Sequence, residues 1–280
     1  MKYQAIIIDL DGTLLNDNNQ ICVNNIEAVQ QALYEGYQVT LASGRPHQLM
    51  LPFAKQLGIT APMICCNGAY QYDVSSNSYQ NVQSLSSTQL AQLLDTLILG
   101  QFDFTLYAHN GIYALKTSQH FAGLKCQMSQ FDIDVQMAIM PSLAELQDVC
   151  GEVYKVLVSS SDKQALCQLR DSINNVLQAD LSIPNKLDIT CLGVNKGLSA
   201  LTWLSQHNLS PNLTIAFGDG DNDISLFKAV GEPVAMANAS PALRGLANLI
   251  ITDNNSCGIG QYLRLIIREG QHAWQHSYSY

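Results

Sequence analysis

Two aspartates, Asp9 and Asp11, end the first apolar segment of the chain, and Gly12 follows them. Residues two apart in a strand point to the same side, so we expect both carboxylates to face one pocket. Gly12 lets the chain turn sharply directly after them. Such carboxylates can attack a substrate, transfer protons or bind a metal ion. An Asx turn at a strand end is the structural alternative, and the pair alone does not decide between the two.

Further polar residues follow other apolar segments of the chain. The carboxyl ends of parallel strands meet at one edge of an open sheet, so we expect these residues to gather with Asp9 and Asp11. Crowded carboxylates are unfavourable unless a divalent cation neutralises them, and ligands made only of oxygen favour magnesium or manganese. The residues are Ser43 and Gly44 after the segment 39–42, Lys196 at the start of a predicted helix, and Asp219, Asn222 and Asp223 after the segment 213–217.

Each of these features has a plainer interpretation when it is taken alone. Ser43 and Gly44 can form a strand-to-helix turn, and Lys196 can be a solvated lysine at a helix start. The acidic segment 218–223 can be a loop of Asx turns, and it lacks the later glutamate of an EF-hand. The sequence has no motif for a Walker-type nucleotide site, a dinucleotide fold or a serine hydrolase. The combined pattern therefore favours a metal-dependent site at a sheet edge.

Strands and helices alternate over the first and last parts of the chain. Segments 5–10, 39–42 and 62–66 are short, apolar and suited to buried strands, and helical segments separate them. The same alternation returns with strand-like segments at 213–217 and 233–236. This pattern is typical of a parallel sheet that is covered by helices on both faces. We therefore predict an α/β fold with a parallel-sheet core.

The middle of the chain has a different pattern. A leucine stripe after Ser87 indicates a helix, and the turn 109–111 joins two strand-like segments. These signals predict a separate α+β module that is inserted into the first domain. From Glu269 the sequence is polar and aromatic without a period, which predicts a loose tail. The expected boundaries are residues 1–82 and 188–280 for the core, and residues 83–187 for the inserted module.

The composition limits the partners and the compartment. A net charge of −9 without any run of Lys or Arg argues against a nucleic-acid partner. No apolar stretch approaches the ~20 residues that span a bilayer, so no membrane partner is expected. The eight cysteines form no C-x-x-C motif, and the adjacent Cys65 and Cys66 suit buried thiols better than a disulfide or a zinc site. We therefore expect a soluble, reduced, cytoplasmic protein, and its oligomeric state stays open.

Taken together, the motifs resemble those of the haloacid dehalogenase (HAD) superfamily of phosphatases. The insertion is similar to the cap of the Cof-type branch, subfamily IIB, and the segment 64–73 is similar to a bacterial pyridoxal phosphate phosphatase of that branch. The resemblance covers nearly the whole chain apart from the details of the cap and the tail. It implies a Rossmann-like parallel-sheet core, the HAD fold, with an inserted α+β cap of the C2B type. The matching residues are Asp9, Asp11, Gly12, Thr13, Leu14, Ser43, Lys196, Gly218, Asp219, Asn222 and Asp223, with Asn67 and Gly68 similar to the Cof-type branch.

The resemblance also implies a role for each residue of the site. Asp9 would attack phosphorus to form an aspartyl-phosphate, and Asp11 would act as general acid and then as general base. Asp223 would orient Lys196 from behind, and Mg²⁺ would be the cofactor. The implied ligands of Mg²⁺ are Asp9, the backbone carbonyl of Asp11, and Asp219, and the implied phosphate-binding residues are Leu10, Ser43, Gly44, Lys196 and Asn222.

A small phosphomonoester is the expected substrate, because a cap that closes over the site excludes bulk water and large molecules. Pyridoxal phosphate, sugar phosphates and nucleotide or flavin monophosphates all fit this class. Arg45 would either contact the substrate or cap its own loop, and candidate lining residues of the cap are His109, Tyr107 and Lys155. A phosphomutase of the same superfamily and a receiver-like phosphoacceptor or binding protein are the alternative functions.

Overall fold

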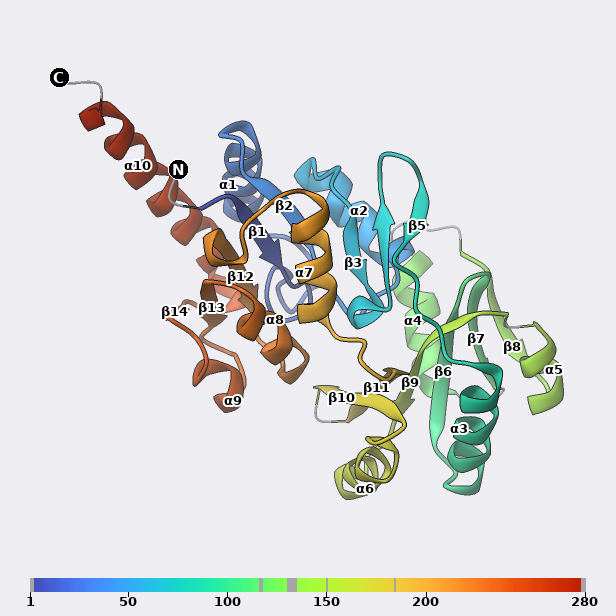
Figure 1. The fold of residues 1–280 in the computed structure, drawn as a ribbon. Helices are drawn as coiled ribbons and strands as arrows, with labels where there is room; N and C mark the ends of the chain where they lie inside the picture. Colours follow the sequence, from blue (N-terminus) through green and yellow to red (C-terminus); the bar gives the residue numbers. More distant parts are fainter. Residues whose placement is uncertain (1–2, 116–117, 130–134, 150, 184, 278–280) are drawn as a thin grey trace.

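The computed structural model describes residues 3–115, 118–129, 135–149, 151–183 and 185–277, which form a core and an inserted unit, each with its own sheet (Figure 1). The core sheet has the strand order β14-β13-β12-β1-β2, and every neighbouring pair in it is parallel. The α/β fold with a parallel-sheet core is therefore confirmed. The strands of the core sheet are β1 (Ala5–Ile8), β2 (Gln38–Leu41), β12 (Thr214–Gly218), β13 (Glu232–Met236) and β14 (Leu249–Ile251).

Helices cover both faces of the core sheet, because its inner strand β1 is apolar on both sides. Ile6 and Ile8 of β1 pack in one cluster with α1, α2 and α10, whereas Ala5 and Ile7 pack on the opposite face with α7, α8 and α9. Burying both faces holds the carboxyl end of β1 in a fixed position between the two helix layers. The covering helices are α1 (Val23–Tyr34), α2 (His47–Leu57), α7 (Lys196–Gln206), α8 (Ile224–Ala229), α9 (Pro241–Arg244) and α10 (Gly258–Ser277).

A small antiparallel sheet follows the first part of the core. Ala42 and Ile64 form a parallel bridge that ties this sheet to the end of β2. The turn η1 (Cys66–Gly68) joins its first two strands, and Asn67 in this turn has a left-handed backbone with φ of 57°. Asparagine tolerates that conformation better than most residues. The strands are β3 (Met63–Cys65), β4 (Tyr70–Asp73) and β5 (Ser78–Gln80), in that order.

The inserted unit is an α+β layer with its own apolar core. Its sheet has the order β10-β11-β9-β6-β7-β8, in which β7 and β8 are parallel and the other pairs are antiparallel. Leucines of α3 and α6 pack on one face of this sheet. The elements are α3 (Ser87–Leu99), β6 (Asp103–Ala108), β7 (Gly111–Leu115), α4 (Gln119–Ser129), β8 (Met137–Met140), α5 (Leu143–Val149), β9 (Val153–Ser159), α6 (Lys163–Ile173), β10 (Leu177–Ile183) and β11 (Lys186–Cys191).

The return from the inserted unit to the core lies after β11. This strand pairs with β9 and β10 of the inserted sheet and runs to Cys191. We therefore propose that the boundary lies between Cys191 and α7, a few residues beyond the expected start of the second core segment at residue 188. The shift matters for function, because Asp188 then belongs to the cap.

The end of the chain is helical where a loose tail was predicted. α10 continues through Glu269 to Ser277 and extends past the core sheet (Figure 1), so the prediction is wrong for residues 269–277. Ile259 and Leu263 share one buried face against the core, and the helix propagates from this anchored start. In the described part of the chain, no helix is both long and apolar enough to cross a membrane.

One pair of cysteines is bonded. Cys22, directly before α1, forms a disulfide with Cys257, directly before α10. The prediction of a fully reduced chain is therefore wrong for this pair. Cys65 and Cys66 are free and buried, as predicted, and burial raises the pKa of Cys66 to about 12.

Replacing Cys22 with alanine is expected to lower the melting temperature by several degrees without reductant. A cross-link between residues 235 positions apart typically contributes about 2–4 kcal/mol. Calorimetry in excess reductant should show equal melting of the variant and the wild type. Cys167→Ala, which removes a thiol outside the disulfide, is the matched control. Equal melting of Cys22→Ala and the wild type without reductant would contradict the bond.

Candidate active site

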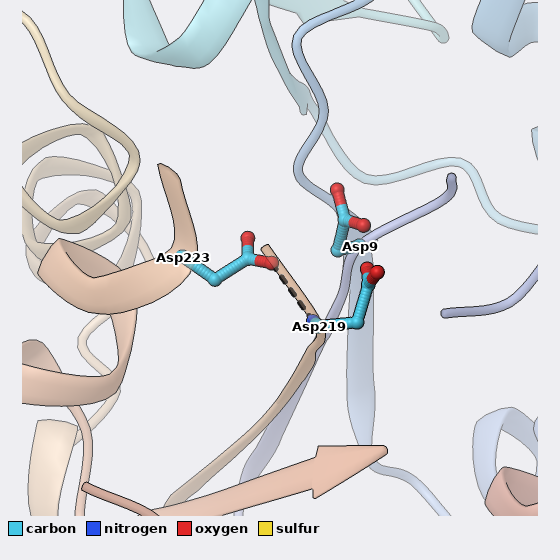
Figure 2. Close-up of side chains that lie close together, drawn as sticks. All are labelled: Asp9, Asp219 and Asp223. Carbon is cyan, nitrogen blue, oxygen red and sulfur yellow. Dashed lines mark hydrogen bonds between the residues drawn. The ribbon is translucent and has the colours of Figure 1, made fainter. Parts of the chain in front are cut away.

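The site begins at the carboxyl ends of β1 and β12, where two parallel neighbours bring Asp9 and Asp219 together (Figure 2). Lys196, the first residue of α7, is fully buried beside them. Its Nζ donates to Asp9 Oδ1 and to Asp223 Oδ1, each at 2.6 Å. Burial alone would lower the pKa of Lys196, but Asp223 and Asp9 together raise it above its ordinary value. Lys196 therefore stays charged and holds Asp9 in place.

Asp223 organises the acidic loop that follows β12. Its Oδ2 accepts hydrogen bonds from the backbone amides of Asp219 at 3.0 Å and Gly220 at 3.1 Å, the first of which is dashed in Figure 2. Thr13 donates to Asp219 Oδ1 at 2.8 Å. Because Lys196 contacts the other oxygen of Asp223, both of its carboxylate oxygens have protein partners. Asp223 lies where it can orient the lysine and the loop.

Gly12 brings the loop after β1 against Asp219. Its φ is +74°, and a Cβ at this position would lie 2.2 Å from Asp219 Oδ2. Asn238 also donates to the backbone carbonyl of Gly12 at 2.8 Å. The loop that carries Asp11 is thus anchored beside the acidic cluster, and a residue with a side chain would push it away.

The acidic cluster suits a divalent cation. Among the described residues, Asp9, Asp219 and Asp223 place one carboxylate oxygen each within 4.8 Å of one another. Burial first and the charge of Asp223 second raise the pKa of Asp9 well above its ordinary value, and the same causes raise the pKa of Asp219 to about 7. The single charge of Lys196 does not balance three carboxylates. Since these ligands offer oxygen alone, Mg²⁺ fits them better than zinc.

Asp11 lies on the cavity side of the same strand end and is paired with Arg45. Arg45 Nε donates to Asp11 Oδ2 at 2.8 Å, and the second guanidinium nitrogen contacts Oδ1. The Asp11 side chain remains 55% exposed, so it is only partly desolvated. Desolvation raises the pKa of Asp11, but the charge and hydrogen bonds of Arg45 outweigh it and lower the pKa below its ordinary value. In this arrangement Arg45 forms an ion pair with Asp11 and keeps it in the carboxylate form.

A cavity of about 290 Å³ separates these groups from the cap. Among the predicted phosphate-binding residues, Ser43, Gly44 and Asn222 line it. Lys196 lies deeper, behind Asp9. The side chain of Leu10 is buried in the core, so a ligand can meet only its backbone. From the core, the cavity is also lined by Asp9, Asp11, Gly12, Arg45, Pro46, Leu49, Asp219 and Gly220.

The cap supplies the roof of this cavity. Tyr107 and Lys155 line it, whereas His109 lies elsewhere, with its Nδ1 2.6 Å from the hydroxyl of Tyr154. Sequence reasoning did not find the other polar residues of the roof, because they belong to no motif. They are His120, Lys186 and Asp188, and the only sequence signal among them is that Asp188 stands at the predicted domain boundary.

The chain is similar to known hydrolases along most of its length. The haloacid dehalogenase-like hydrolase family matches residues 6–263. Pyridoxal phosphate phosphatase YbhA of Escherichia coli is 30% identical over 272 residues, covering 94% of this chain and 98% of the relative. The 5-amino-6-(5-phospho-D-ribitylamino)uracil phosphatase YitU of Bacillus subtilis is 23% identical, covering 94% and 97%. A solved HAD subclass IIB sugar phosphatase, 20% identical, has a TM-score of 0.79 and covers 94% of this chain and 98% of its own.

The chain therefore belongs to the haloacid dehalogenase-like hydrolase family. Within that family it is a phosphatase, and the recognition of the superfamily from the motifs is confirmed. The subclass IIB structure shares the fold over both the core and the insertion.

Binding of a divalent cation is expected to release protons near neutral pH. Without metal, Asp219 has a pKa of about 7, so near neutral pH part of it holds a proton that the cation must displace. Mg²⁺ affinity should therefore rise as the pH increases through about 7. Calorimetric titration in two buffers of different protonation enthalpy measures the released protons.

The control for this titration is a neighbouring carboxylate outside the cluster. Asp219→Asn should weaken Mg²⁺ binding and reduce the proton release, whereas Asp221→Asn should change neither, because Asp221 accepts a hydrogen bond from Ser240 instead. A Mg²⁺ affinity that does not change with pH would contradict the assignment of these carboxylates as ligands.

Proposed function

We propose that the protein is a Mg²⁺-dependent phosphomonoester hydrolase that acts on small phosphorylated metabolites through a phospho-aspartate on Asp9. One observation carries this proposal. Asp9 is held at 2.6 Å by the buried Lys196 and faces the same cavity as Asp11. A fixed carboxylate nucleophile and a second carboxylate beside the leaving group are what a two-step phosphoryl transfer to water requires.

Asp9 is placed to attack phosphorus. Lys196 binds Oδ1 of Asp9, which leaves Oδ2 to approach phosphorus in line with the departing oxygen. A bond from Asp9 to phosphorus forms as the bond to the substrate's alcohol oxygen breaks. Asp11 gives a proton to that oxygen, and it then takes a proton from the water that attacks the aspartyl-phosphate. Inorganic phosphate leaves and free Asp9 is restored.

The remaining residues hold charge and orientation. Asp9, Asp219 and the backbone carbonyl of Asp11 are the proposed ligands of Mg²⁺, which supplies positive charge beside the phosphoryl oxygens when it is bound. The proposed partners of the phosphoryl oxygens are the Ser43 hydroxyl, the Asn222 carboxamide and the backbone amides of Leu10 and Gly44, with Lys196 balancing the charge from behind Asp9.

Arg45 controls which form of Asp11 is present. The ion pair favours the carboxylate, which is the form that accepts a proton from the hydrolytic water. Proton donation to the leaving group requires the pair to loosen, and the phosphoryl group of a substrate is the natural competitor for the guanidinium. Arg45 thus links the arrival of an anionic substrate to the protonation of Asp11.

The shape of the cavity supports a compact substrate with a polar leaving group. About 290 Å³ is near the lower end of the range for ligand pockets. Tyr107 offers an aromatic wall, and burial lowers the pKa of His120 to about 4, so that its ring is neutral. Burial also lowers the pKa of Lys186, whose amine can meet an oxygen of the leaving group. Pyridoxal phosphate, which the E. coli relative's name contains, is the first candidate. Sugar phosphates and nucleotide or flavin monophosphates follow.

The sequence predictions of the partner class and of the cellular compartment are retained. The net charge of −9 favours small molecules over nucleic acid as the partner. The cytoplasmic location stays a prediction from the sequence.

Phosphate release from a panel of small phosphomonoesters tests the proposal. We expect release that requires Mg²⁺, stops with a chelator and is abolished in Asp9→Asn, because the amide cannot act as the nucleophile. Asp221→Asn, a neighbouring carboxylate outside the site, should retain wild-type activity. Substantial turnover by Asp9→Asn would refute the role of Asp9. Transfer to a second sugar would indicate a phosphomutase, and a long-lived phosphoprotein without turnover would indicate a receiver-like protein.

The pH profile of kcat tests the pairing of Arg45 with Asp11. Removing the guanidinium in Arg45→Met removes the cause that lowers the pKa of Asp11, so this pKa rises. The limb of the profile that is lost in Asp11→Asn should therefore move to higher pH in Arg45→Met. Arg170→Met, which removes a surface arginine paired with Asp171, is the control. A limb that stays in place would disprove the coupling.

A further inference from the structure

A buried ion pair of the cap lies directly over the phosphate-binding loop. Lys155 on β9 and Asp188 on β11 are joined at 2.9 Å, and their side chains are 4% and 3% exposed. Burying two charges is costly unless further hydrogen bonds satisfy them. The further hydrogen-bond partners that satisfy this pair lie in the core.

Both members of the ion pair make hydrogen bonds to the core. Lys155 Nζ donates to the backbone carbonyl of Gly44 at 2.6 Å, and Asn67 Nδ2 donates to Asp188 Oδ2 at 2.9 Å. Lys155 also lies over the ring of Tyr107, 4.6 Å from its centre. The ammonium is thus held by protein groups on several sides. It serves the contact between cap and core better than it could serve a substrate.

Asn67 connects this contact to the phosphate-binding side of the cavity. Asn222 Nδ2 donates to Asn67 Oδ1 at 3.1 Å, so the donors and acceptors run without conflict from Lys155 through Asp188 and Asn67 to Asn222. A carboxamide nitrogen carries two hydrogens. With one hydrogen of Asn222 bound to Asn67, the orientation of its carboxamide is set and the second hydrogen can reach a phosphoryl oxygen.

The packing at Gly44 shows that the contact between the two units is close. A Cβ on Gly44 would lie 3.1 Å from Asn67 Oδ1 and 3.1 Å from Asp188 Oδ2. A larger residue would therefore press on the hydrogen bond between the cap and the turn η1. Asn67 itself is buried, and its hydrogen bonds to Asp188 and from Asn222 leave its side chain little freedom.

We infer that Asp188 is a positioning residue. When the cap closes, the Lys155–Asp188 pair docks on Gly44 and Asn67, and Asn67 then fixes the carboxamide of Asn222 for the phosphoryl group. Opening of the cap leaves the ion pair intact but releases Asn67, and Asn222 loses its orientation. Cap closure and phosphoryl binding therefore favour each other, and such coupling is reciprocal. The inference rests on the proposed function, since it takes Asn222 as a phosphoryl ligand.

The hydrogen bonds that run from Lys155 through Asp188 and Asn67 to Asn222 form a relay. Two variants break this relay at different places. In Asp188→Asn the amide cannot accept hydrogen bonds from both Lys155 and Asn67 without turning an N–H toward one of these donors. In Asn67→Gly the carboxamide is removed, while glycine keeps the left-handed backbone without strain. Asp180→Asn is the matched control. Asp180 lies opposite Asp188 in the β10–β11 pair, and its Oδ1 accepts a hydrogen bond from Gln178.

The measurements are kcat for several phosphomonoesters and inhibition by inorganic phosphate, both with Mg²⁺. We expect each relay variant to lose about 10- to 100-fold in kcat, the range typical when the outer hydrogen-bond partners of metal-ligating residues are removed. The loss should be similar for all leaving groups, and inorganic phosphate should inhibit correspondingly less. The double variant should lose little more than either single variant, because both interrupt one chain of contacts. Asp180→Asn should behave like the wild type.

Other outcomes overturn the inference. Wild-type kcat and phosphate inhibition in Asp188→Asn, or a loss that depends on the leaving group, would make Asp188 a structural or specificity residue instead. Fully multiplicative losses in the double variant would show that Asp188 and Asn67 act separately. Binding of inorganic phosphate keeps this test apart from the test of the proposed function, which uses Asp9→Asn. If the wild type hydrolyses no phosphomonoester, the proposed function fails, while calorimetric binding of inorganic phosphate still tests the relay.

Discussion

The interaction on which the site depends is the contact of one buried ammonium with two buried carboxylates. Lys196 lies 2.6 Å from both Asp9 and Asp223, and none of the three has appreciable exposure. Breaking such a contact by removing one partner leaves an uncompensated buried charge, which typically costs about 3–5 kcal/mol. The arrangement of β1, β12 and α7 serves this contact. Of two parallel neighbouring strands, β1 ends directly before Asp9 and β12 ends before the loop that carries Asp223, and the first residue of α7 is the lysine that joins these two carboxylates.

The same crowding explains why the site is built for a divalent cation and an anionic substrate. Asp219 and Asp9 carry pKa values raised by burial and by the charge of Asp223, which means that the site is short of positive charge. A bound metal ion would supply that charge on the core side. From above, Lys186 of the cap lines the cavity and can add positive charge. In a chain with a net charge of −9, the pocket that we propose for a phosphate group would thus be a local feature.

The parts of this account that follow from the sequence are those that depend on strand ends. Asp9, Ser43 and Asp219 end apolar segments, and parallel pairing alone brings such residues together, so the core of the site could be predicted. Cap residues such as His120 could not, because the sequence does not show which face of the inserted sheet turns toward the core. The Cys22–Cys257 bond was not predicted, because its partners are 235 residues apart and no local sequence pattern joins them. The helix beyond Glu269 depends on an anchored start rather than on its own composition.

Direct trapping of the covalent intermediate tests the central claim, that Asp9 takes up the phosphoryl group. The measurement uses the Asp11→Asn variant with a phenolic phosphomonoester, whose leaving group departs without a proton, so that the aspartyl-phosphate accumulates. Acid quenching followed by borohydride reduction converts an aspartyl-phosphate to homoserine, and mass spectrometry of the peptides locates it. The account predicts homoserine at position 9. Released phenol with an unmodified Asp9, or with homoserine at another aspartate, would contradict it.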